Sequence, residues 1–283
     1  TYQHIEAVPL AAAMGAEIRG VNLADLSDAA FTEIEQALFR HKMIFFRDQN
    51  IDHGDQERFS LRFGPFAADA YGKGMEGHPD VHAVIKEADA RAGMIFGSGW
   101  HTDSPFLPEP PAITLLRGVD IPPYGGDTIW VNTALAYAAL SPVMQGVLQN
   151  LKVHMSMQKV VASLKSLDPD WSRQVEARPD TAAKVAGSYH PLVRTHPRTG
   201  EKGLYCDATY ASGIEGMTQP EADALLDFLR AHITQAAFSC RLRWEVNTVA
   251  VWDNRLCLHQ AFNDFDGFRR ELYRTTVTGE APA

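Results

Sequence analysis

The chain has 283 residues, of which 45% are hydrophobic and 22% charged, and its formal net charge is −9 at neutral pH. This composition is typical of a soluble globular protein and excludes an intrinsically disordered chain. The acidic balance argues against a nucleic-acid partner, which needs clustered Lys and Arg. No apolar run approaches the roughly 20 residues that cross a bilayer, so we expect no membrane association.

The cysteines and the first residues indicate a cytoplasmic protein. Cys206, Cys240 and Cys257 are odd in number and lack metal-type spacing, so they predict neither a disulfide framework nor a zinc ribbon. Residues 1–4 carry no basic or apolar region of a secretory signal. The oligomeric state stays open, a homo-oligomer included.

The first quarter of the chain predicts two helices around a buried strand. Ser27 is a suitable N-cap for the first helix, and the apolar run 43–46 is typical of a buried strand. Asp52 opens the second helix, which we expect to carry Phe59 and Phe63. The apolar positions of the first helix are Phe31, Ile34 and Leu38.

The middle of the chain predicts further strands and short helices. Residues 81–85, 113–116 and 127–131 are strand candidates. The last of these leads into Asn132, a good N-cap for a short helix. Ser141, followed by a proline, starts another helix.

Residues 159–188 are polar, mixed in charge and interrupted by Pro169 and Pro179. They predict an irregular insertion over the core. Such insertions are often lids over a binding site, and a solvated surface loop without ligand contact is an equally valid interpretation.

The last third predicts one long helix and then several strands. Thr218 and Glu221 form a capping-box signature. Residues 238–244 alternate apolar and polar, as a half-buried strand does, and residues 249–252 and 271–277 add two more strands. The buried stripe of the helix is expected at Leu225, Leu226, Leu229 and Ile233.

This succession predicts a mostly β fold. Many short strands with helices gathered in three segments indicate a double-sheet jelly roll, cupin-like and decorated by α-helices. Residues 1–283 show no repeat and no linker, so we expect a single domain.

The segment Trp100–Asp103 carries the strongest chemical signal. In an extended strand residues i and i+2 project to one side, so His101 and Asp103 can face one ion. Joined to the distant His259, they form the two-histidine, one-carboxylate set of non-haem Fe(II) oxygenases, which leaves three coordination positions open. We therefore predict a metal-dependent enzyme.

A second His-x-Asp sequence occurs at His78 and Asp80. It lies in a Gly-His-Pro-Asp context that favours a turn. We expect it to bind no metal.

Arg270 and Arg274 lie four residues apart in a predicted strand, so both share one face at a separation of roughly 13 Å. Arginine suits bidentate binding of a carboxylate or sulfonate, and two buried guanidinium groups would be costly without anions. The alternative is that one or both pair with a resident Asp or Glu, or point outward.

Taken together, the motifs resemble those of the Fe(II)- and 2-oxoglutarate-dependent dioxygenases of the taurine and 2,4-dichlorophenoxyacetate dioxygenase (TauD/TfdA) family. The likeness runs along nearly the whole chain. The motifs that carry it, in order, are residues 15–21, Arg62-Phe63-Gly64, Trp100-His101-Thr102-Asp103, Gly125-Gly126-Asp127-Thr128, His196-Pro197 with Gly200, and Trp252-Asp253-Asn254.

The resemblance implies a decorated double-stranded β-helix and a set of roles. The metal ligands would be His101, Asp103 and His259, with Fe(II) as the metal and 2-oxoglutarate and O2 as co-substrates. The distal carboxylate of 2-oxoglutarate would bind Thr128 and Arg270, with Trp252 packing nearby or simply in the core. Arg274 matches the position that binds the acidic group of the primary substrate.

The substrate side is less specific. The histidine and asparagine that taurine dioxygenases use are missing at the matching places, and the chain looks more like the (R)-dichlorprop type of aryloxyalkanoate dioxygenase. Ser104 and Tyr71 are candidate substrate contacts, and Phe66 and Phe96 are candidates for an apolar wall or for the core. We expect a small organic acid as substrate, with ether cleavage an option; an alkylsulfate or alkylsulfonate dioxygenase is the alternative, and a non-catalytic metal- or anion-binding barrel is the alternative of another class.

Overall fold

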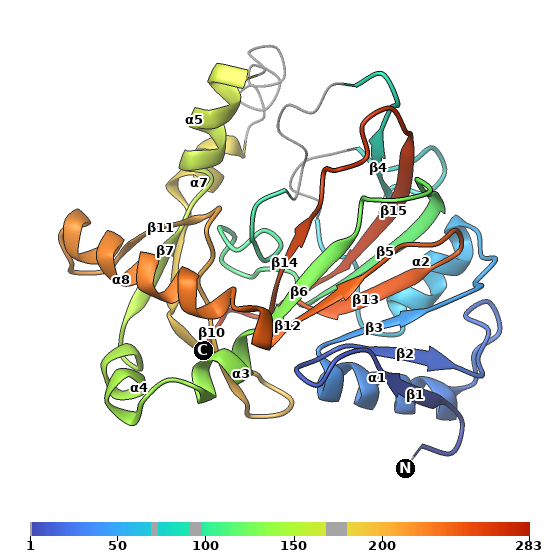
Figure 1. The fold of residues 1–283 in the computed structure, drawn as a ribbon, viewed down its shortest axis with the longest axis horizontal. Helices are drawn as coiled ribbons and strands as arrows, with labels where there is room; N and C mark the ends of the chain where they lie inside the picture. The colour runs from blue at the N-terminus through green and yellow to red at the C-terminus, as the bar shows by residue number, and fades with distance from the viewer. Residues whose placement is uncertain (1, 69–72, 91–97, 168–179) are drawn as a thin grey trace.

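The computed structural model describes residues 2–68, 73–90, 98–167 and 180–283 (Figure 1). The helices are α1 (Asp28–His41), α2 (His53–Leu61), α3 (Thr133–Ala138), α4 (Pro142–Leu148), α5 (Gln158–Leu167), α7 (Thr181–Ala186), α8 (Gln219–Ile233) and the 3-10 helix η1 (Ala236–Phe238). The strands are β1 (Glu6–Pro9), β2 (Ala16–Arg19), β3 (Met43–Phe46), β4 (His82–Lys86), β5 (Ile113–Asp120), β6 (Thr128–Asn132), β7 (Lys152–Met155), β8 (Ser188–Pro191), β9 (Val193–Thr195), β10 (Lys202–Leu204), β11 (Ala211–Ile214), β12 (Ser239–Leu242), β13 (Val249–Asp253), β14 (Cys257–Ala261) and β15 (Arg270–Val277).

Two facing sheets form the centre of the molecule. A seven-stranded sheet has the order β1-β2-β3-β13-β5-β15-β4, and a three-stranded sheet has the order β12-β6-β14. Buried side chains from both sheets, among them Leu116, Trp130, Leu242 and Leu272, form one core cluster. This is the predicted jelly roll with helical decoration, and the prediction of fold class is confirmed.

The strand order brings remote segments together. The late strands β13 and β15 lie between strands from the first half of the chain, because β13 pairs with β3 and β5, and β15 pairs with β5 and β4. Segments separated by more than a hundred residues are therefore neighbours, as a site built from residues near 100 and 259 requires.

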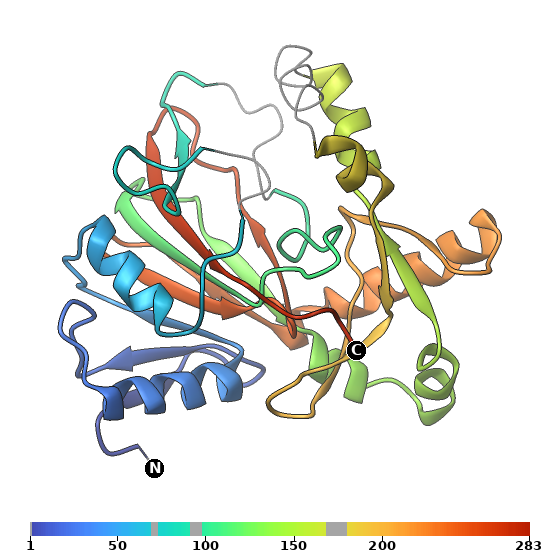
Figure 2. The ribbon, with the colours of Figure 1, turned by 180° about the vertical axis from the view of Figure 1, so that it is seen from behind.

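Helices α1 and α2 cover the outer face of the seven-stranded sheet (Figure 2). The Ser27 hydroxyl accepts a hydrogen bond from the Ala30 amide and so caps α1, and Asp52 forms a capping box with Asp55 at the start of α2. Phe59 is buried in α2, but Phe63 lies beyond the end of that helix. Phe63 lies in the turn after α2, which ends at Leu61, and packs against the edge of the core cluster that contains Phe59.

A second part of the molecule packs beside the jelly roll. It contains the sheet β11-β7-β8, the hairpin β10-β9 and α8. The capping box of α8 forms as predicted, and Leu226, Leu229 and Ile233 are buried in a core cluster that also includes Val131 and Leu258 from the three-stranded sheet. The two parts therefore share packed side chains.

The segment 159–188 differs from its expected form. In place of a wholly irregular insertion, α5 and α7 occupy its two ends, and residues 168–179 lie outside the described residues. Val161 is buried against the same core cluster as α8, so the beginning of the segment contributes to packing. Its role as a lid stays a prediction, as does the single-domain interpretation.

The strand predicted over 238–244 is shorter in the structure. β12 ends at Leu242, although the alternation continues through the exposed Arg243 to the buried Trp244. Within the described residues, no helix has both the length and the apolar composition that a bilayer crossing demands.

Candidate active site

His101 and His259 are joined directly by their backbones. The His101 amide donates to the His259 carbonyl at 3.0 Å, and the His259 amide donates to the His101 carbonyl at 2.8 Å. This isolated antiparallel bridge is the only strand-like pairing of the Trp-His-Thr-Asp segment, which bends immediately afterwards. The extended strand predicted for this segment is thus a single bridge in the structure, because His101 is the one residue of the segment that pairs with β14.

The three predicted metal ligands converge. The Oδ1 atom of Asp103 lies 3.7 Å from Nε2 of His101 and 3.7 Å from Nε2 of His259. One ligand atom from each residue lies within 4.8 Å of the others, and within the described part of the chain this is the one such group of His, Cys, Asp or Glu side chains. Two imidazoles and a carboxylate so arranged suit a divalent metal ion.

Each group is held in a protonation state suitable for ligation. The Nδ1 atom of His101 lies 2.7 Å from the Gly99 carbonyl, so Nδ1 carries the proton and Nε2 has its lone pair toward the trio. Burial, helped by the neighbouring His101 and Arg274 side chains, lowers the pKa of His259 to about 3. Burial alone would raise the pKa of Asp103, but His259, Arg274 and His101 lower it below its ordinary value.

Arg270 carries a buried positive charge without a matching carboxylate contact. Its side chain is 5% exposed, and its Nε and Nη2 atoms have no hydrogen-bond partner among the described residues. Burial lowers its pKa to about 10, and the acidic residues Asp127 and Asp264 only partly oppose that. The Asp127 carboxylate binds Arg241 and the Asp264 carboxylate binds the Gly126 amide, so both are engaged elsewhere.

Thr128 is linked to this guanidinium through Trp244. Its hydroxyl accepts a hydrogen bond from the indole N–H of Trp244 at 2.9 Å, and the Trp244 ring lies 5.9 Å from the Arg270 guanidinium carbon. Gly126, at φ +68°, approaches so closely that a Cβ there would lie 3.2 Å from the Arg270 side chain. A glycine is required at this position because it combines a left-handed conformation with this close approach.

The strand registers place these groups on the same interior face. Thr128 pairs with Ala261 and Trp130 pairs with His259, so Thr128 lies two residues along the sheet from His259, roughly 7 Å. Arg270 and Arg274 flank the buried Leu272 on the inward side of β15. The predicted shared face of the two arginines is therefore correct, and it faces the space between the sheets.

The residues predicted to contact the primary substrate differ in burial and in position. Arg274 is half-buried, and its charge acts on both Asp103 and His259. Ser104 directly follows Asp103 and has a left-handed backbone at φ +45°. Phe66 is half-buried and bridges to Val277. Tyr71 and Phe96 lie outside the described residues.

Trp252 packs against a predicted metal ligand, His259. Its ring lies 4.8 Å from the His259 ring and 5.6 Å from the Trp130 ring, and it is 2% exposed. Its contact with 2-oxoglutarate stays a prediction. The second His-x-Asp sequence lies elsewhere, with His78 hydrogen-bonded to Glu57 at 2.8 Å.

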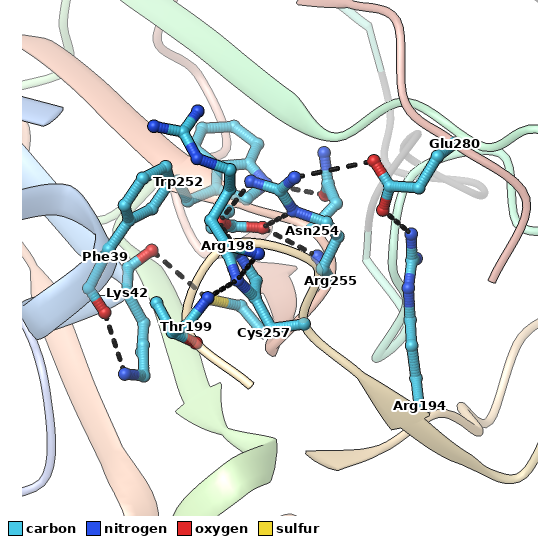
Figure 3. Close-up of polar contacts among 12 residues, drawn as sticks. Phe39, Lys42, Arg194, Arg198, Thr199, Trp252, Asn254, Arg255, Cys257 and Glu280 are labelled. Atoms are coloured by element: carbon cyan, nitrogen blue, oxygen red, sulfur yellow. Dashed lines mark hydrogen bonds and ion pairs between the residues drawn. The ribbon is translucent and has the colours of Figure 1, made fainter. Parts of the chain in front are cut away.

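A second group of buried charges lies behind the Trp-Asp-Asn motif, and we call it the polar cluster (Figure 3). Both Asp253 oxygens accept hydrogen bonds from Arg255, at 2.8 Å each, and one of them also contacts His196 at 2.9 Å. Glu280 bridges Arg255 to Arg194. The polar cluster consists of Arg194, His196, Asp253, Arg255 and Glu280, so the His-Pro motif serves an ion-pair network.

Sequence reasoning missed several residues around the site. Thr114 and Asn254 contact Asp103, and Trp244 contacts Thr128. Trp244 had a detectable signal, since it falls on the apolar side of the alternating segment 238–244. Thr114 had no such signal, because the sequence of an apolar strand does not show that its threonine hydroxyl faces a carboxylate.

This geometry defines a class of protein: a jelly-roll metal enzyme whose facial trio shares the interior between the sheets with a buried arginine suited to an anionic co-substrate. The chain belongs to the taurine catabolism dioxygenase TauD, TfdA family, whose model matches residues 6–276.

The relatives are similar along nearly the whole chain. An alpha-ketoglutarate-dependent sulfate ester dioxygenase of Pseudomonas putida is 37% identical over 97% of this chain and 89% of its own length. The alpha-ketoglutarate-dependent 2,4-dichlorophenoxyacetate dioxygenase of Cupriavidus pinatubonensis is 30% identical over 98% of this chain and 99% of its own. The crystal structure of a taurine dioxygenase from Burkholderia xenovorans superposes with a TM-score of 0.82 at 37% identity, covering 99% of this chain and 93% of that one.

The class of reaction follows from this membership. The chain is a 2-oxoglutarate-dependent dioxygenase that uses a metal ion and O2 and acts on a small molecule. Alpha-ketoglutarate is another name for 2-oxoglutarate. The predicted family and enzyme class are confirmed.

Proposed function

We propose that this enzyme is Fe(II)-dependent and oxidises a small organic anion whose sulfate or carboxylate group docks on Arg274. In this proposal His101, Asp103 and His259 hold the iron, and Thr128 and Arg270 hold the distal carboxylate of 2-oxoglutarate. The observation that carries it is the buried, unmatched guanidinium of Arg270 on the same interior face as the trio.

The protein's part in the chemistry is to position and to neutralise. The iron with 2-oxoglutarate and O2 supplies the oxidant. Arg270, buried and aided by the Thr128 hydroxyl, orients the co-substrate through a charge-assisted bond. Arg274 brings the substrate anion to the side of the trio on which its charge already acts. The neutral His259 keeps its lone pair for the metal.

Two substrate classes share this recognition chemistry. Hydroxylation of the carbon next to oxygen in an alkyl sulfate gives a hemiacetal-type sulfate that collapses to an aldehyde and free sulfate. The same step on an aryloxyalkanoate gives a phenol and an oxo acid. We place alkyl sulfates first, because the sulfate ester dioxygenase is 37% identical to this chain and the 2,4-dichlorophenoxyacetate dioxygenase 30%.

The experiment is a substrate panel with Fe(II), O2 and 2-oxoglutarate. Succinate is measured for all substrates, inorganic sulfate for alkyl sulfates and phenol for aryloxyalkanoates. We expect succinate and sulfate in equal amounts with a medium-chain alkyl sulfate. Phenol release alone would transfer the assignment to aryloxyalkanoates. Absence of succinate with every compound would overturn the proposal and favour a metal- or anion-binding barrel.

A variant tests the role of Arg274 in the same assay. Arg274→Ala should raise the KM for the primary substrate by about 10- to 100-fold, because a charge-assisted bond to an anion contributes about 1.5–3 kcal/mol. The KM for the co-substrate should stay near its original value. A reversed pattern would mean that the roles of the two arginines are exchanged.

A further inference from the structure

The two oxygens of Asp103 have different surroundings. Oδ1 faces the imidazoles of His101 and His259 at 3.7 Å from each. Oδ2 accepts a hydrogen bond of 2.6 Å from the Thr114 hydroxyl of β5. Only Oδ1 is therefore presented to a metal, while Oδ2 is occupied by the protein.

The direction of the Thr114 hydroxyl is determined by Asn254. The Asn254 amide nitrogen donates to the Thr114 oxygen at 2.8 Å, so the single hydroxyl proton of Thr114 is left for Asp103. A hydroxyl has one proton to donate, and a charged acceptor receives it most favourably.

The orientation of the Asn254 amide is in turn determined by Trp252. The indole N–H of Trp252 lies 3.0 Å from the Asn254 Oδ1 atom. An indole can only donate, so the atom facing it must be the amide oxygen, and the amide nitrogen must face Thr114. The order Trp252, Asn254, Thr114, Asp103 is thus a chain of donors with one polarity.

The chain of donors is rigid and inaccessible to water. Thr114 is 0% exposed, and Asn254 and Trp252 are each 2% exposed. The Asn254 backbone is anchored as well, because its amide donates to the Ala112 carbonyl at 2.8 Å and its carbonyl accepts from Thr102 at 2.9 Å. The starting ring, Trp252, packs on His259. One relay therefore restrains two of the three candidate ligands.

We propose that Thr114 and Asn254 are positioning residues that hold Asp103 as a one-oxygen ligand. A carboxylate free to turn could offer both oxygens to the metal and occupy a position needed for 2-oxoglutarate or O2. The relay prevents this by engaging Oδ2. The inference rests on the proposed metal site, and it adds that the geometry of that site is set from β5 and from the Trp-Asp-Asn motif.

The test replaces one hydroxyl and measures metal binding directly. Thr114→Val keeps the shape of the side chain and removes the donor, and Thr114→Ser keeps the donor. Thr275→Val is the matched control, because Thr275 is also buried in the seven-stranded sheet but its hydroxyl contacts Ser60 instead. Co(II) is the probe, with affinity and ligand-field spectrum recorded by visible titration.

We expect Thr114→Val to bind Co(II) about 10- to 100-fold more weakly, as loss of outer contacts to metal ligands does, with an altered spectrum. Thr114→Ser and Thr275→Val should keep the original affinity and spectrum. Equal affinity and an unchanged spectrum in a folded Thr114→Val protein would overturn the inference. Failure of the original protein itself to bind Co(II) would instead refute the metal site.

A second variant decides the matter if Thr114→Val does not fold. Trp252→Phe keeps a ring against His259 but removes the indole donor, so the Asn254 oxygen keeps only the longer contact of 3.4 Å with the Asp103 amide and is held less firmly. We expect a several-fold loss of Co(II) affinity. Affinity equal to that of the original protein would contradict the relay.

Discussion

The polar cluster and the space between the sheets both contain buried arginines, and they differ in whether folding has already neutralised the charge. In the polar cluster, Arg255 binds both oxygens of Asp253 and contacts Glu280. Between the sheets, Arg270 is equally buried, yet two of its nitrogens have no partner in the described part of the chain. The exposed fractions are 6% and 5%, so burial does not distinguish them.

The difference separates a structural charge from a functional one. An unpaired buried ion costs several kcal/mol, whereas a paired and hydrogen-bonded ion recovers most of that cost within the fold. Arg255 therefore stabilises the native state through Asp253. In the proposed function, Arg270 lowers the stability of the ligand-free protein and recovers the cost when 2-oxoglutarate binds. Substitution of Arg255 should therefore lower stability, whereas substitution of Arg270 should lower ligand affinity and leave stability equal or higher.

The largest effect is expected at the metal site. Asp103→Ala should abolish succinate formation, because one of three proposed ligands is lost, while the chelator-treated protein should melt near the original temperature. Succinate release and a thermal melt with chelator measure the two quantities. Asp227→Ala, at an exposed carboxylate, is the control. Full activity of Asp103→Ala would refute the metal assignment.

The polar cluster should respond in stability. Arg255→Met leaves Asp253 buried without its guanidinium, and breaking such a pair costs about 3–5 kcal/mol. Urea unfolding of the metal-free protein measures this loss. Arg241→Met removes a surface pair with Asp127 and should cost less than about 1 kcal/mol. An Arg255→Met protein as stable as the original would remove the contrast between the two regions.

Arg270→Met should show the opposite signature. We expect 2-oxoglutarate affinity to fall about 100-fold, which corresponds to about 2.7 kcal/mol, while stability without ligand stays equal or rises. Calorimetric titration and urea unfolding measure both. Arg243→Met, at an exposed arginine just after β12, should leave both unchanged. Destabilisation by Arg270→Met would show that its charge already has a partner in the protein.

The smallest effect is the pH dependence of the polar cluster. Burial alone would raise the pKa of Asp253, but Arg255 and His196 lower it well below its ordinary value. A carboxylate with a lowered folded pKa stabilises the fold above its unfolded pKa of about 3.9, and this contribution is lost as the pH falls further. The stability gap between the original protein and Arg255→Met should therefore narrow as the pH falls from pH 7, by at least about 1 kcal/mol at pH 3. Urea unfolding with chelator tests this, and a constant gap down to pH 3 would contradict it.

Local signals in the sequence were sufficient for the helix starts and for the choice of candidate metal ligands. Ser27, Asp52 and Thr218 cap helices where the pattern predicted them, since a cap and its partners lie within four residues. The order of the motifs identified His101, Asp103 and His259 before their geometry was known. Strand ends were less accurate, as at Leu242, because a ladder ends where its partner strand ends.

Such local signals do not predict contacts between residues far apart in the chain. The sequence leaves open whether Arg270 meets a carboxylate, and the answer depends on Asp127 and Asp264, which bind other groups. The contact of Thr114 with Asp103 depends on the placement of β5 beside β13, whose residue Trp252 pairs with Thr114.

By itself the sequence determined the chemical groups, the helix caps and the faces of the strands, because these depend on neighbours in the chain. Only the tertiary structure decided which buried charge is neutralised and which carboxylate oxygen is held. Those outcomes depend on strand register between segments more than a hundred residues apart, and a register is selected by the summed packing of whole sheets rather than by any one residue.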